Sequence, residues 1–486
     1  MIKGFYKQVQ QQPEAPAVYI HNRFFSYKTV WNKAVSLSIQ IHSTNAWIAL
    51  YTENSIETYA GILGIILSGN GLVPLNPKFP ISRLSTICKT AKTETIVGSS
   101  NNAKYLSKLH PDVTVIQQDK LKQSTENNVS FKHSKDDPAY LLFTSGSTGK
   151  PKGIPISHNN FTSFIDSMKD LEFDFDQQDK WLQSFELSFD VSLACTFLCW
   201  EYGACLYPID TSNIVPIESI KAIMEHKLSI ATITPSMVAY LEQLKILNEV
   251  TLSSLKYTFF TAEALTEDIV TSWRKASDNC SIINAYGPTE ASVWSFISII
   301  KNDTHYINNM APIGKALKNI QFKTGENQEK GELQLGGKQI ASFYLNDDKT
   351  SKENFYHTDI QWYKTGDIVG KNKDGEFVFL YRKDDQVQIN GFRVEPDDIA
   401  AAIKHIFPGK RVIVLPQKDT SGINYLVAAI ETDKLDLKKT NDHLRELLPA
   451  YMIPTKITAI ANFPVNNSGK TDRKKIIEII HEQNKN

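Results

Sequence analysis

The chain has 486 residues, of which 41% are hydrophobic and 22% are charged. This composition is typical of a folded globular protein and excludes a disordered one, and the length exceeds what one hydrophobic core holds, so we expect two or more domains. Lysine plus arginine equals aspartate plus glutamate at 53 each, so the charge balance gives no support for a nucleic-acid partner.

The remaining global features indicate a cytoplasmic location without membrane insertion. The N-terminus, MIKGFYKQVQQQ, lacks the apolar segment of a signal peptide. The most apolar run, residues 61–75, is interrupted by the turn-like Ser68–Gly71 and is too short to span a bilayer. The five cysteines show no CxxC spacing, which argues against a zinc site or a disulfide framework.

In the first half of the chain, short apolar runs alternate with amphipathic segments. Residues 47–50, 114–116 and 140–143 are predicted to be buried strands, and residues 55–67 and 217–226 are predicted to be helices. Alternation of this kind predicts layered α/β structure with parallel sheets.

From about Asn284 the pattern changes to short strands separated by glycine and aspartate turns. Strands are predicted at residues 331–335, 339–344 and 376–381, and together they suggest a small β-barrel or antiparallel sheet. The charged cluster at residues 381–385 has no apolar anchor, and we expect it to be a linker.

The last hundred residues predict a compact α+β unit. Segments 386–389, 412–415 and 425–430 are expected strands, and segments 396–406 and 435–448 are expected helices. We therefore predict an N-terminal core over residues 1–381, with two α/β layered subdomains and a small β-barrel, and a small mobile α+β domain over residues 382–486.

The segment Phe143-Thr-Ser-Gly-Ser-Thr-Gly-Lys-Pro-Lys-Gly153 follows a predicted buried strand. Its glycines permit close approach of the backbone to a ligand, and consecutive N–H groups in such a loop form a cradle for anions. Hydroxyls and two lysines add donors and positive charge, so the loop predicts phosphate binding. Gly146 and Gly149 are separated by two residues, which excludes the spacing of the common nucleotide loop.

The sequence TSGSTGKPKG resembles the phosphate loop of the adenylate-forming superfamily, which includes acyl-CoA synthetases, luciferases and nonribosomal peptide synthetase adenylation domains. Further segments resemble the superfamily's other motifs in order: Asn284–Glu290 (NAYGPTE), Tyr363–Asp367 (YKTGD), Arg382–Gly391, Leu448–Pro454 and Asn467–Arg473. The resemblance runs from about Phe25 to Arg473 and is closest to free-standing enzymes such as D-alanine–carrier protein ligases.

The resemblance implies an ATP-dependent ligase that forms an acyl-adenylate with release of pyrophosphate and then a carbon–sulfur bond. The catalytic candidates are Lys470, which would bridge the substrate carboxylate and ATP, Glu290, which would hold Mg²⁺, and Thr144. Asp384 is the expected hinge residue, and Gly391 is expected beside a pantetheine tunnel. The expected ATP-binding residues are Thr144, Ser145, Gly146, Ser147, Thr148, Gly149, Lys152, Asn284, Ala285, Tyr286, Gly287, Pro288, Thr289, Asp367, Arg382 and Lys470.

Particular contacts are expected within that set. Tyr286 would stack on adenine and Asn284 would hydrogen-bond its edge. Thr289 would donate to the α-phosphate. Asp367 would accept both ribose hydroxyls, because a carboxylate suits two donors, and Arg382 would add a ribose or phosphate contact.

Asp190, in Ser188-Phe-Asp-Val-Ser192, matches the aspartate that pairs with the substrate α-ammonium in amino-acid-activating members. It favours an amino-acid substrate, with Lys470 as a further contact. The side-chain pocket is expected to be lined by Val191, Ala194, Thr258, Phe260, Ala285, Val293 and Trp294. The two bulky aromatic side chains predict a small substrate such as glycine or alanine.

The chain ends soon after Arg473, so we expect a separate phosphopantetheinylated carrier protein to be the acceptor. Two alternatives remain open from the sequence. One is an acyl- or aryl-CoA ligase, and the other is an inactive binding protein on the same scaffold.

Overall fold

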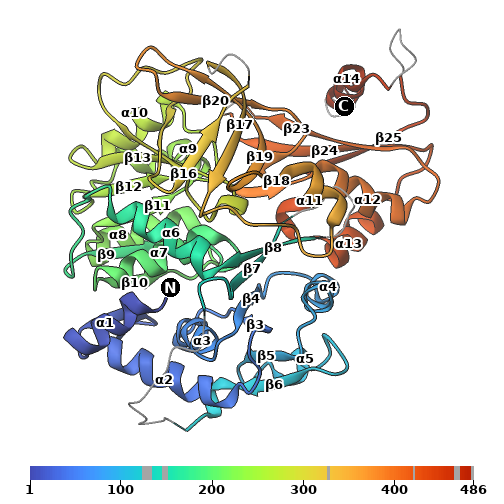
Figure 1. Ribbon diagram of the computed structural model, residues 1–486. Helices are drawn as coiled ribbons and strands as arrows, with labels where there is room; N and C mark the ends of the chain where they lie inside the picture. The colour runs from blue at the N-terminus through green and yellow to red at the C-terminus, as the bar shows by residue number, and fades with distance from the viewer. Residues whose placement is uncertain (123–133, 145–150, 326–328, 420–421, 465–470, 483–486) are drawn as a thin grey trace. The chain divides into compact units, whose positions relative to one another are not determined.

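The computed structural model describes residues 1–122, 134–144, 151–325, 329–419, 422–464 and 471–482. The chain divides into two compact units (Figure 1). The first comprises Met1–Pro77, Ile87–Phe143 and Gly153–Lys383, and the second comprises Lys78–Thr86, Thr144–Lys152 and Asp384–Asn486. Among the described residues, no helix has the length and apolar character needed to cross a membrane.

A six-stranded sheet in the N-terminal third of the chain has the strand order β6-β5-β3-β4-β7-β8. Its strands are β3 (Trp47–Tyr51), β4 (Gly71–Leu75), β5 (Thr95–Gly98), β6 (Thr114–Gln117), β7 (Pro138–Thr144) and β8 (Lys152–Ser157). Pairing within β6-β5-β3-β4-β7 is parallel, as expected for apolar strands separated by helices. The strands predicted at residues 47–50, 114–116 and 140–143 are confirmed.

Helices alternate with these strands along the chain, and side-chain caps begin two of them, α2 and α3. They are α2 (Tyr27–Gln40), α3 (Ile56–Leu67), α4 (Ile81–Ala91) and α5 (Ala103–Leu106). The Ser55 side chain accepts from the Thr58 backbone N–H and so caps α3. Helix α3 packs on α2, β3 and β4, and every one of its residues except Glu57 is buried.

A 14-stranded sheet dominates the first unit, with the order β16-β17-β19-β20-β15-β14-β13-β12-β11-β9-β10-β1-β2 and with β18 beside β19. The strands on the side of β1 are β1 (Pro16–Ile20), β2 (Arg23–Ser26), β9 (Lys180–Gln183), β10 (Cys205–Pro208), β11 (Ile230–Ile233), β12 (Tyr257–Phe260) and β13 (Ser281–Tyr286). From β1 to β13 the pairing is parallel, which confirms the second α/β layer.

Helices α7 to α10 of this layer connect its parallel strands, while α1 precedes β1 and α6 precedes β9. The helices of the layer are α1 (Lys3–Gln11), α6 (His158–Lys169), α7 (Asp190–Glu201), α8 (Val215–His226), α9 (Pro235–Gln243) and α10 (Glu267–Ala276). The helix predicted at residues 217–226 corresponds to α8. Helix α7 packs on β9, β10, α1 and α6. All of its residues except Glu201 are buried, so its first residue, Asp190, lies in the interior.

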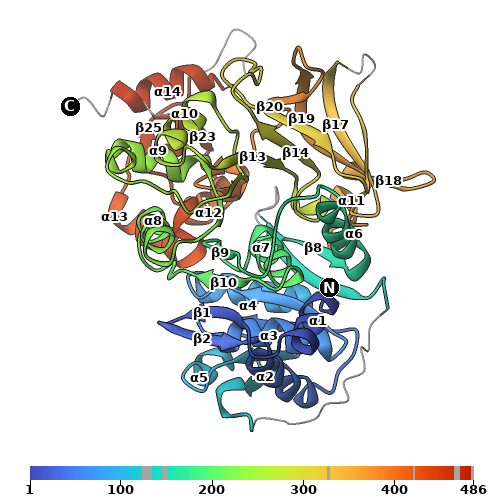
Figure 2. The ribbon, with the colours of Figure 1, turned by 90° about the vertical axis from the view of Figure 1, so that its left-hand side faces the viewer.

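The other end of the same sheet is antiparallel (Figure 2). Its strands are β14 (Phe296–Ile300), β15 (Pro312–Ala316), β16 (Ile320–Lys323), β17 (Lys330–Gly337), β18 (Phe355–His357), β19 (Gln361–Lys371) and β20 (Phe377–Arg382), with helix α11 at Asp348–Asn354. Within the described residues these strands extend the long sheet, and no separate closed barrel is seen.

One predicted strand of this region, residues 339–344, is wrong. The chain leaves β17 at Gly337, whose φ of +118° belongs to glycine-favouring backbone. Residues 339–344 then form an irregular segment, anchored by the Ala341 backbone N–H, which donates to the Glu290 carbonyl at 2.8 Å. The apolar spacing of this segment reflects burial against a loop rather than pairing in a sheet.

The second unit has α+β structure, as predicted. Its elements are β21 (Val387–Ile389), β22 (Phe392–Val394), α12 (Pro396–Ile406), β23 (Val412–Lys418), β24 (Asn424–Glu431), α13 (Leu437–Leu447), β25 (Lys456–Ile460) and α14 (Arg473–Glu482). Asn390 and Gly391 connect β21 to β22 with φ of +50° and +80°, the two-residue hairpin turn that Asn-Gly favours.

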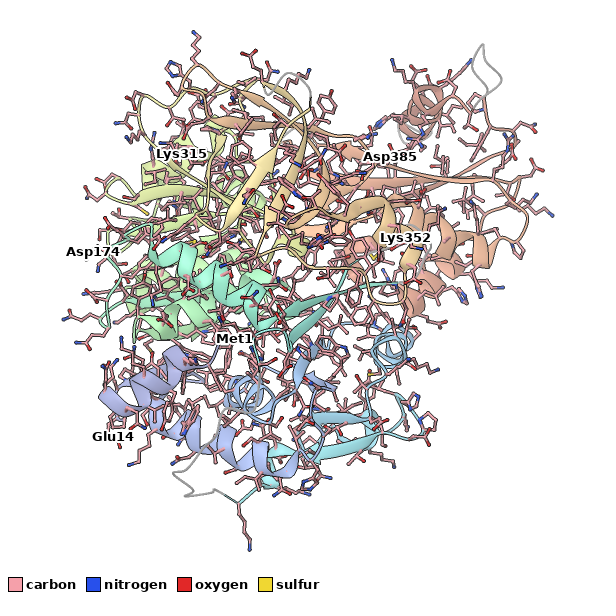
Figure 3. All side chains as sticks on the ribbon, viewed as in Figure 1. Met1, Glu14, Asp174, Lys315, Lys352 and Asp385 are labelled. Carbon is pink, nitrogen blue, oxygen red and sulfur yellow. The ribbon has the colours of Figure 1, made fainter. Side chains whose placement is uncertain are left out.

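Each unit has its own apolar core. In the first unit one core cluster includes residues of α2, α3 and α7, and a second includes residues of α8, α9 and α10. In the second unit, separate clusters lie around α12 with α13 and around α14. Charged side chains such as those of Asp174 and Lys315 project from the surface (Figure 3).

Candidate active site

The segment between β13 and β14 forms a tight loop that carries the NAYGPTE motif. The Ser295 backbone N–H donates to the Tyr286 carbonyl at 2.7 Å and closes the loop. A Cβ on Gly287 would lie 2.1 Å from the Val293 carbonyl oxygen, so only glycine fits there. Ser292 and Val293 have φ of +56° and +78°, which is strained backbone, above all for a β-branched residue. The loop is therefore held in a conformation that its sequence alone disfavours.

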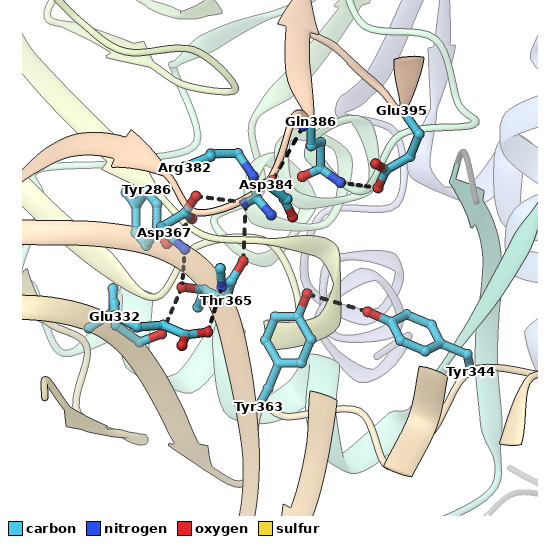
Figure 4. Close-up of polar contacts among 12 residues, drawn as sticks. Tyr286, Glu332, Tyr344, Tyr363, Thr365, Asp367, Arg382, Asp384, Gln386 and Glu395 are labelled. Atoms are coloured by element: carbon cyan, nitrogen blue, oxygen red, sulfur yellow. Dashed lines mark hydrogen bonds and ion pairs between the residues drawn. The ribbon is translucent and has the colours of Figure 1, made fainter. Parts of the chain in front are cut away.

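Glu290 is fully buried within this loop. The Tyr344 hydroxyl donates to Glu290 Oε1 at 2.7 Å. It also lies 3.3 Å from the Tyr363 hydroxyl (Figure 4). The sequence predicted Glu290 but not its tyrosine partner. Tyr344 closes an apolar run and fits the pattern of a core residue equally well, so no signal in the sequence distinguished it. Tyr363, which contacts Tyr344, begins the YKTGD motif.

Gln339 is a second residue that the sequence did not reveal. Its buried side-chain amide donates to the carbonyls of Ala291 at 3.2 Å and Trp294 at 2.9 Å. The Ser292 hydroxyl donates to the Gln339 carbonyl at 2.7 Å. These bonds satisfy the backbone of the strained loop and fix its shape. A glutamine next to the apolar Ile340 was the available hint.

Asp190 begins α7 and is buried. Burial raises the pKa of its carboxyl to about 6, and a hydrogen bond with the Thr289 hydroxyl partly offsets that effect. The charge of Glu290 adds to the increase in pKa. Two buried carboxylates from separate segments are thus brought close together, in surroundings that favour cationic ligands. Thr289, expected to face the α-phosphate, is bonded to Asp190 here.

Asn substitution at Asp190 is expected to stabilise the protein above pH 7. A folded-state pKa raised from 3.8 to about 6 means that this group favours the fold below about pH 4 and loses that contribution as pH rises through about 6. The cost at pH 8 is roughly 3 kcal/mol. In urea unfolding, the Asp190→Asn variant should therefore have a higher free energy of unfolding than the unaltered chain at pH 8, and this difference should shrink towards pH 4.

Asp303→Asn, at an exposed site, is the matched control and should show no such trend. If Asp190→Asn raised the free energy of unfolding equally at pH 4 and pH 8, the raised pKa of Asp190 would be contradicted.

Asp367 lies on β19 directly opposite Arg382 on β20. Arg382 donates to Asp367 Oδ1 at 2.7 Å, and the Tyr286 hydroxyl donates to Oδ2 at 2.5 Å (Figure 4). Burial and the neighbouring carboxylate raise the pKa of Tyr286 far above its usual value. Gly366, with φ of +74°, makes the predicted Thr-Gly-Asp turn a kink within the strand. The ribose-motif and adenine-motif residues therefore meet, as the resemblance implies.

Replacing Asp367 by asparagine is expected to raise the KM for ATP about tenfold, because charge-assisted hydrogen bonds are lost while the size of the side chain is kept. Arg382, whose side chain is 18% exposed, would also lose its charge partner. ATP-dependence of pyrophosphate exchange measures the effect. Asp374→Asn, at an exposed aspartate bonded to His305, is the control, and an equal KM in both variants would remove Asp367 from the nucleotide site.

The residues predicted to line the substrate pocket do not all belong to the same core cluster. Val191, Ala194, Ala285, Val293 and Trp294 belong to one core cluster. Phe260 belongs to the other cluster, and Thr258, which accepts from the Trp273 indole at 3.0 Å, points the same way.

Thr258 and Phe260 lie on the face of β12 opposite Phe259, because successive residues of a strand point to opposite faces. The ring of Phe259, not that of Phe260, stacks on Trp294, with centroids 5.3 Å apart and planes 2° apart. Phe164 contacts the same indole edge-on at 5.9 Å, and the Trp294 Nε1–H donates to Thr261 Oγ1 at 2.9 Å. Contacts with three residues therefore hold the Trp294 indole in place.

The other predicted residues are placed as follows. Asn284 is buried, and its side-chain amide donates to the Pro312 carbonyl at 2.8 Å. Thr144 ends β7 and Lys152 begins β8, strands that are neighbours in the six-stranded sheet. Asp384 accepts from the Gln386 backbone N–H at 3.3 Å in the second unit (Figure 4). Pro288 precedes the short 3₁₀ helix Thr289–Ala291. Ser145, Gly146, Ser147, Thr148, Gly149 and Lys470 lie outside the described residues.

The residues present fit a magnesium–nucleotide complex. Among the described residues, no three His, Cys, Asp or Glu side chains converge as a metal cage. Mg²⁺ is ordinarily bound by one or two carboxylates together with substrate phosphates. The buried Glu290 carboxylate, which accepts a hydrogen bond from Tyr344 and lies near the charge of Asp190, would be the carboxylate that holds such an ion.

Residues 5–345 match the family model described as AMP-binding enzyme. The chain belongs to this AMP-binding enzyme family. Two relatives illustrate the range of proteins to which it is similar. D-alanine–D-alanyl carrier protein ligase of Staphylococcus epidermidis is 29% identical over 97% of this chain and 98% of its own length. Gramicidin S synthase 2 of Brevibacillus brevis is 26% identical over 96% of this chain, which spans only 11% of that protein.

A solved structure confirms the fold of this AMP-binding enzyme. The Vibrio cholerae adenylation domain AlmE, solved in complex with glycyl-adenosine-5′-phosphate, superposes with a TM-score of 0.87. The two chains are 24% identical, and the match covers 99% of this chain and 97% of AlmE. The predicted adenylate-forming fold is therefore correct.

Proposed function

We propose that this AMP-binding enzyme adenylates a small amino acid with ATP and then transfers the aminoacyl group to the phosphopantetheine thiol of a separate carrier protein. The observation that carries the proposal is the buried Asp190 beside Thr289 and Glu290. A desolvated carboxylate binds an ammonium group strongly. A fatty or aryl acid offers no such partner, so the burial of Asp190 favours an amino acid.

In the first step, a carboxylate oxygen of the amino acid attacks the α-phosphorus of ATP, and the bond to the leaving pyrophosphate breaks. Catalysis of this step consists mostly of positioning and charge stabilisation. Asp190 would orient the amino acid, Asp367 would hold the ribose, and Glu290 would hold Mg²⁺, which neutralises phosphate charge. Thr144, Lys152 and Lys470 would supply the remaining phosphate contacts.

In the second step, the carrier thiol attacks the acyl carbon and AMP leaves. Support for a separate carrier comes from the relative named D-alanine–D-alanyl carrier protein ligase, which the chain matches over nearly its whole length. The division into an adenylation core of residues 1–381 and a mobile lid of residues 382–486, with Asp384 as hinge, is part of this proposal.

The deciding experiment is ATP–pyrophosphate exchange with a panel of amino acids, fatty acids and aryl acids. We expect exchange with glycine or alanine and none with the corresponding acids that lack the α-amino group. Exchange with fatty or aryl acids alone would establish an acyl-CoA-type ligase instead. Exchange with none of the acids would favour a binding protein.

Replacing Trp294 by leucine is expected to move the preference towards larger aliphatic amino acids. The fixed indole limits the depth of the pocket, and space for one or two methylenes changes the ratio of kcat/KM values by about tenfold. Phe260→Leu is the matched control, because Phe260 lies in the opposite core cluster. Equal shifts in both variants would show that Trp294 does not line the substrate pocket.

A further inference from the structure

A cavity of about 390 Å³ lies in the second unit, and none of the described residues that line it is given an individual role in adenylation above. It is formed by α12, by the turn before β23 and by the start of α14, and Asp385, labelled in Figure 3, lies at its edge. Its volume falls in the range of small-molecule sites.

Four cationic side chains line this cavity: Lys404, Lys410, Arg411 and Arg473. They come from three separate segments of the chain. Gly409, with φ of +75°, turns the backbone so that Lys410 and Arg411 follow immediately. Bringing four like charges together is unfavourable unless anions offset them, so their convergence requires an explanation.

Carboxylates account for part of that positive charge. Arg411 is held by Glu431 through Nε and Nη2, and the Arg411 hydrogen bond lowers the pKa of Glu431 to about 2. Arg473 Nη1 donates to Asp385 Oδ2 at 2.6 Å. Each guanidinium is thereby fixed in position, and each has further N–H donors beyond the bonds shown between described residues.

Lys404 and Lys410 add positive charge that the carboxylates of Glu431 and Asp385 do not neutralise. Both are exposed, and the ion pairs that the structure shows between described residues include neither of them. Two fixed guanidinium groups and two lysines around one small cavity suit a phosphate group, which accepts several charge-assisted hydrogen bonds at once.

The remaining lining distinguishes an organic phosphate from an inorganic one. Asp397, in the first turn of α12, adds a carboxylate, which repels an anion but accepts from hydroxyl or amide donors. Ala400 and the buried Phe463 add an apolar surface. A ligand with a phosphate at one end and hydroxyl or amide groups next to it matches this combination.

We propose that the second unit holds a binding site for an organic phosphate ester, with Lys404, Lys410, Arg411 and Arg473 around the phosphate. The site itself does not depend on the adenylation reaction. The identity of the ligand does rest on the proposed function, because the phosphopantetheine arm of the carrier protein is an organic phosphate ester.

The test is calorimetric titration of the full chain with 4′-phosphopantetheine and, separately, with inorganic phosphate. A non-hydrolysable ATP analogue is present throughout to fill the nucleotide site. We expect saturable binding of 4′-phosphopantetheine that weakens about tenfold in the double variant Lys404→Ala/Lys410→Ala. The control, Lys438→Ala/Lys439→Ala, removes the same charge from exposed positions on α13 and should bind like the unaltered chain.

Equal binding of inorganic phosphate, weakened in the same variant, would overturn the preference for an organic ester and leave a site that recognises the phosphate group alone. Absence of saturable binding, or equal binding by both double variants, would overturn the site itself. Pyrophosphate exchange, measured in parallel, separates the two proposals. If the chain catalyses exchange but both double variants bind 4′-phosphopantetheine equally, only the phosphate site is refuted. If the chain catalyses no exchange but the Lys404→Ala/Lys410→Ala variant binds more weakly than the control, only the proposed function is refuted.

Discussion

Glu290→Gln is expected to lower kcat/KM for amino-acid-dependent pyrophosphate exchange by about 100-fold. The substitution keeps the size of a fully buried side chain and an oxygen that accepts from Tyr344. What it removes is the negative charge, which is what a Mg²⁺ ligand supplies. The expected result is therefore a loss of magnesium affinity with little change in the fold. A titration of exchange rate against Mg²⁺ and direct Mn²⁺ binding, followed by electron paramagnetic resonance, measure this.

Tyr344→Phe extends the same test to the positioning of the carboxylate. Removal of its hydroxyl leaves Glu290 charged but less firmly oriented, so we expect a smaller loss, about tenfold. Glu225→Gln, at an exposed site on α8, is the matched control for the charge change. Unaltered Mg²⁺ dependence in Glu290→Gln would remove Glu290 from the metal site, whatever the change in rate.

Lys470→Ala is expected to reduce exchange by up to about 1000-fold, because a positioned cation that stabilises charge in a transition state contributes on that scale. The residue lies outside the described part of the chain, and its role follows from the Asn-Ser-Gly-Lys motif. Lys474→Ala removes the same charge from an exposed position on α14 only four residues away. We expect that control to retain its activity.

Thermal unfolding of both lysine variants should match that of the unaltered chain, and this would show that the loss of activity in Lys470→Ala does not come from unfolding. Equal activities for Lys470→Ala and Lys474→Ala would mean that the basic stretch acts only through its net charge.

Much of the fold could be predicted from periodicity alone. The helix predicted at residues 396–406 has these bounds in the structure, and the apolar run at residues 47–50 became the buried strand β3. Residues 339–344 failed because their apolar side chains pack against the strained loop around Glu290, a contact between distant parts of the chain. The continuity of one sheet from β2 to β16 likewise depends on pairings between strands far apart in the sequence.

In the candidate site, too, some residues could be predicted from the sequence and others could not. Asp190, Glu290 and Asp367 could be named from their motifs, and the structure brings Asp190 to Glu290 and Asp367 to Tyr286. The residues that hold Glu290 and its loop could not be named from the sequence, because Tyr344 and Gln339 act through tertiary hydrogen bonds. Phe260, which the sequence suggested for the pocket, and Phe259, which stacks on Trp294, lie on opposite faces of β12, because a shift of one residue reverses the face of a strand.

Strand β19 carries three buried side chains, those of Tyr363, Thr365 and Asp367, and the Gly366 kink lies between the last two. Tyr363 contacts the tyrosine that holds Glu290, and Asp367 is the proposed ribose ligand. Under the proposed function, the strand would set the distance between the two ends of a bound nucleotide. A mutation that inserts or deletes one residue of β19 between positions 363 and 367 would turn one of these side chains to the opposite face. Length variation should therefore be tolerated in the turn after Lys371, at Gly375, but not within this four-residue interval.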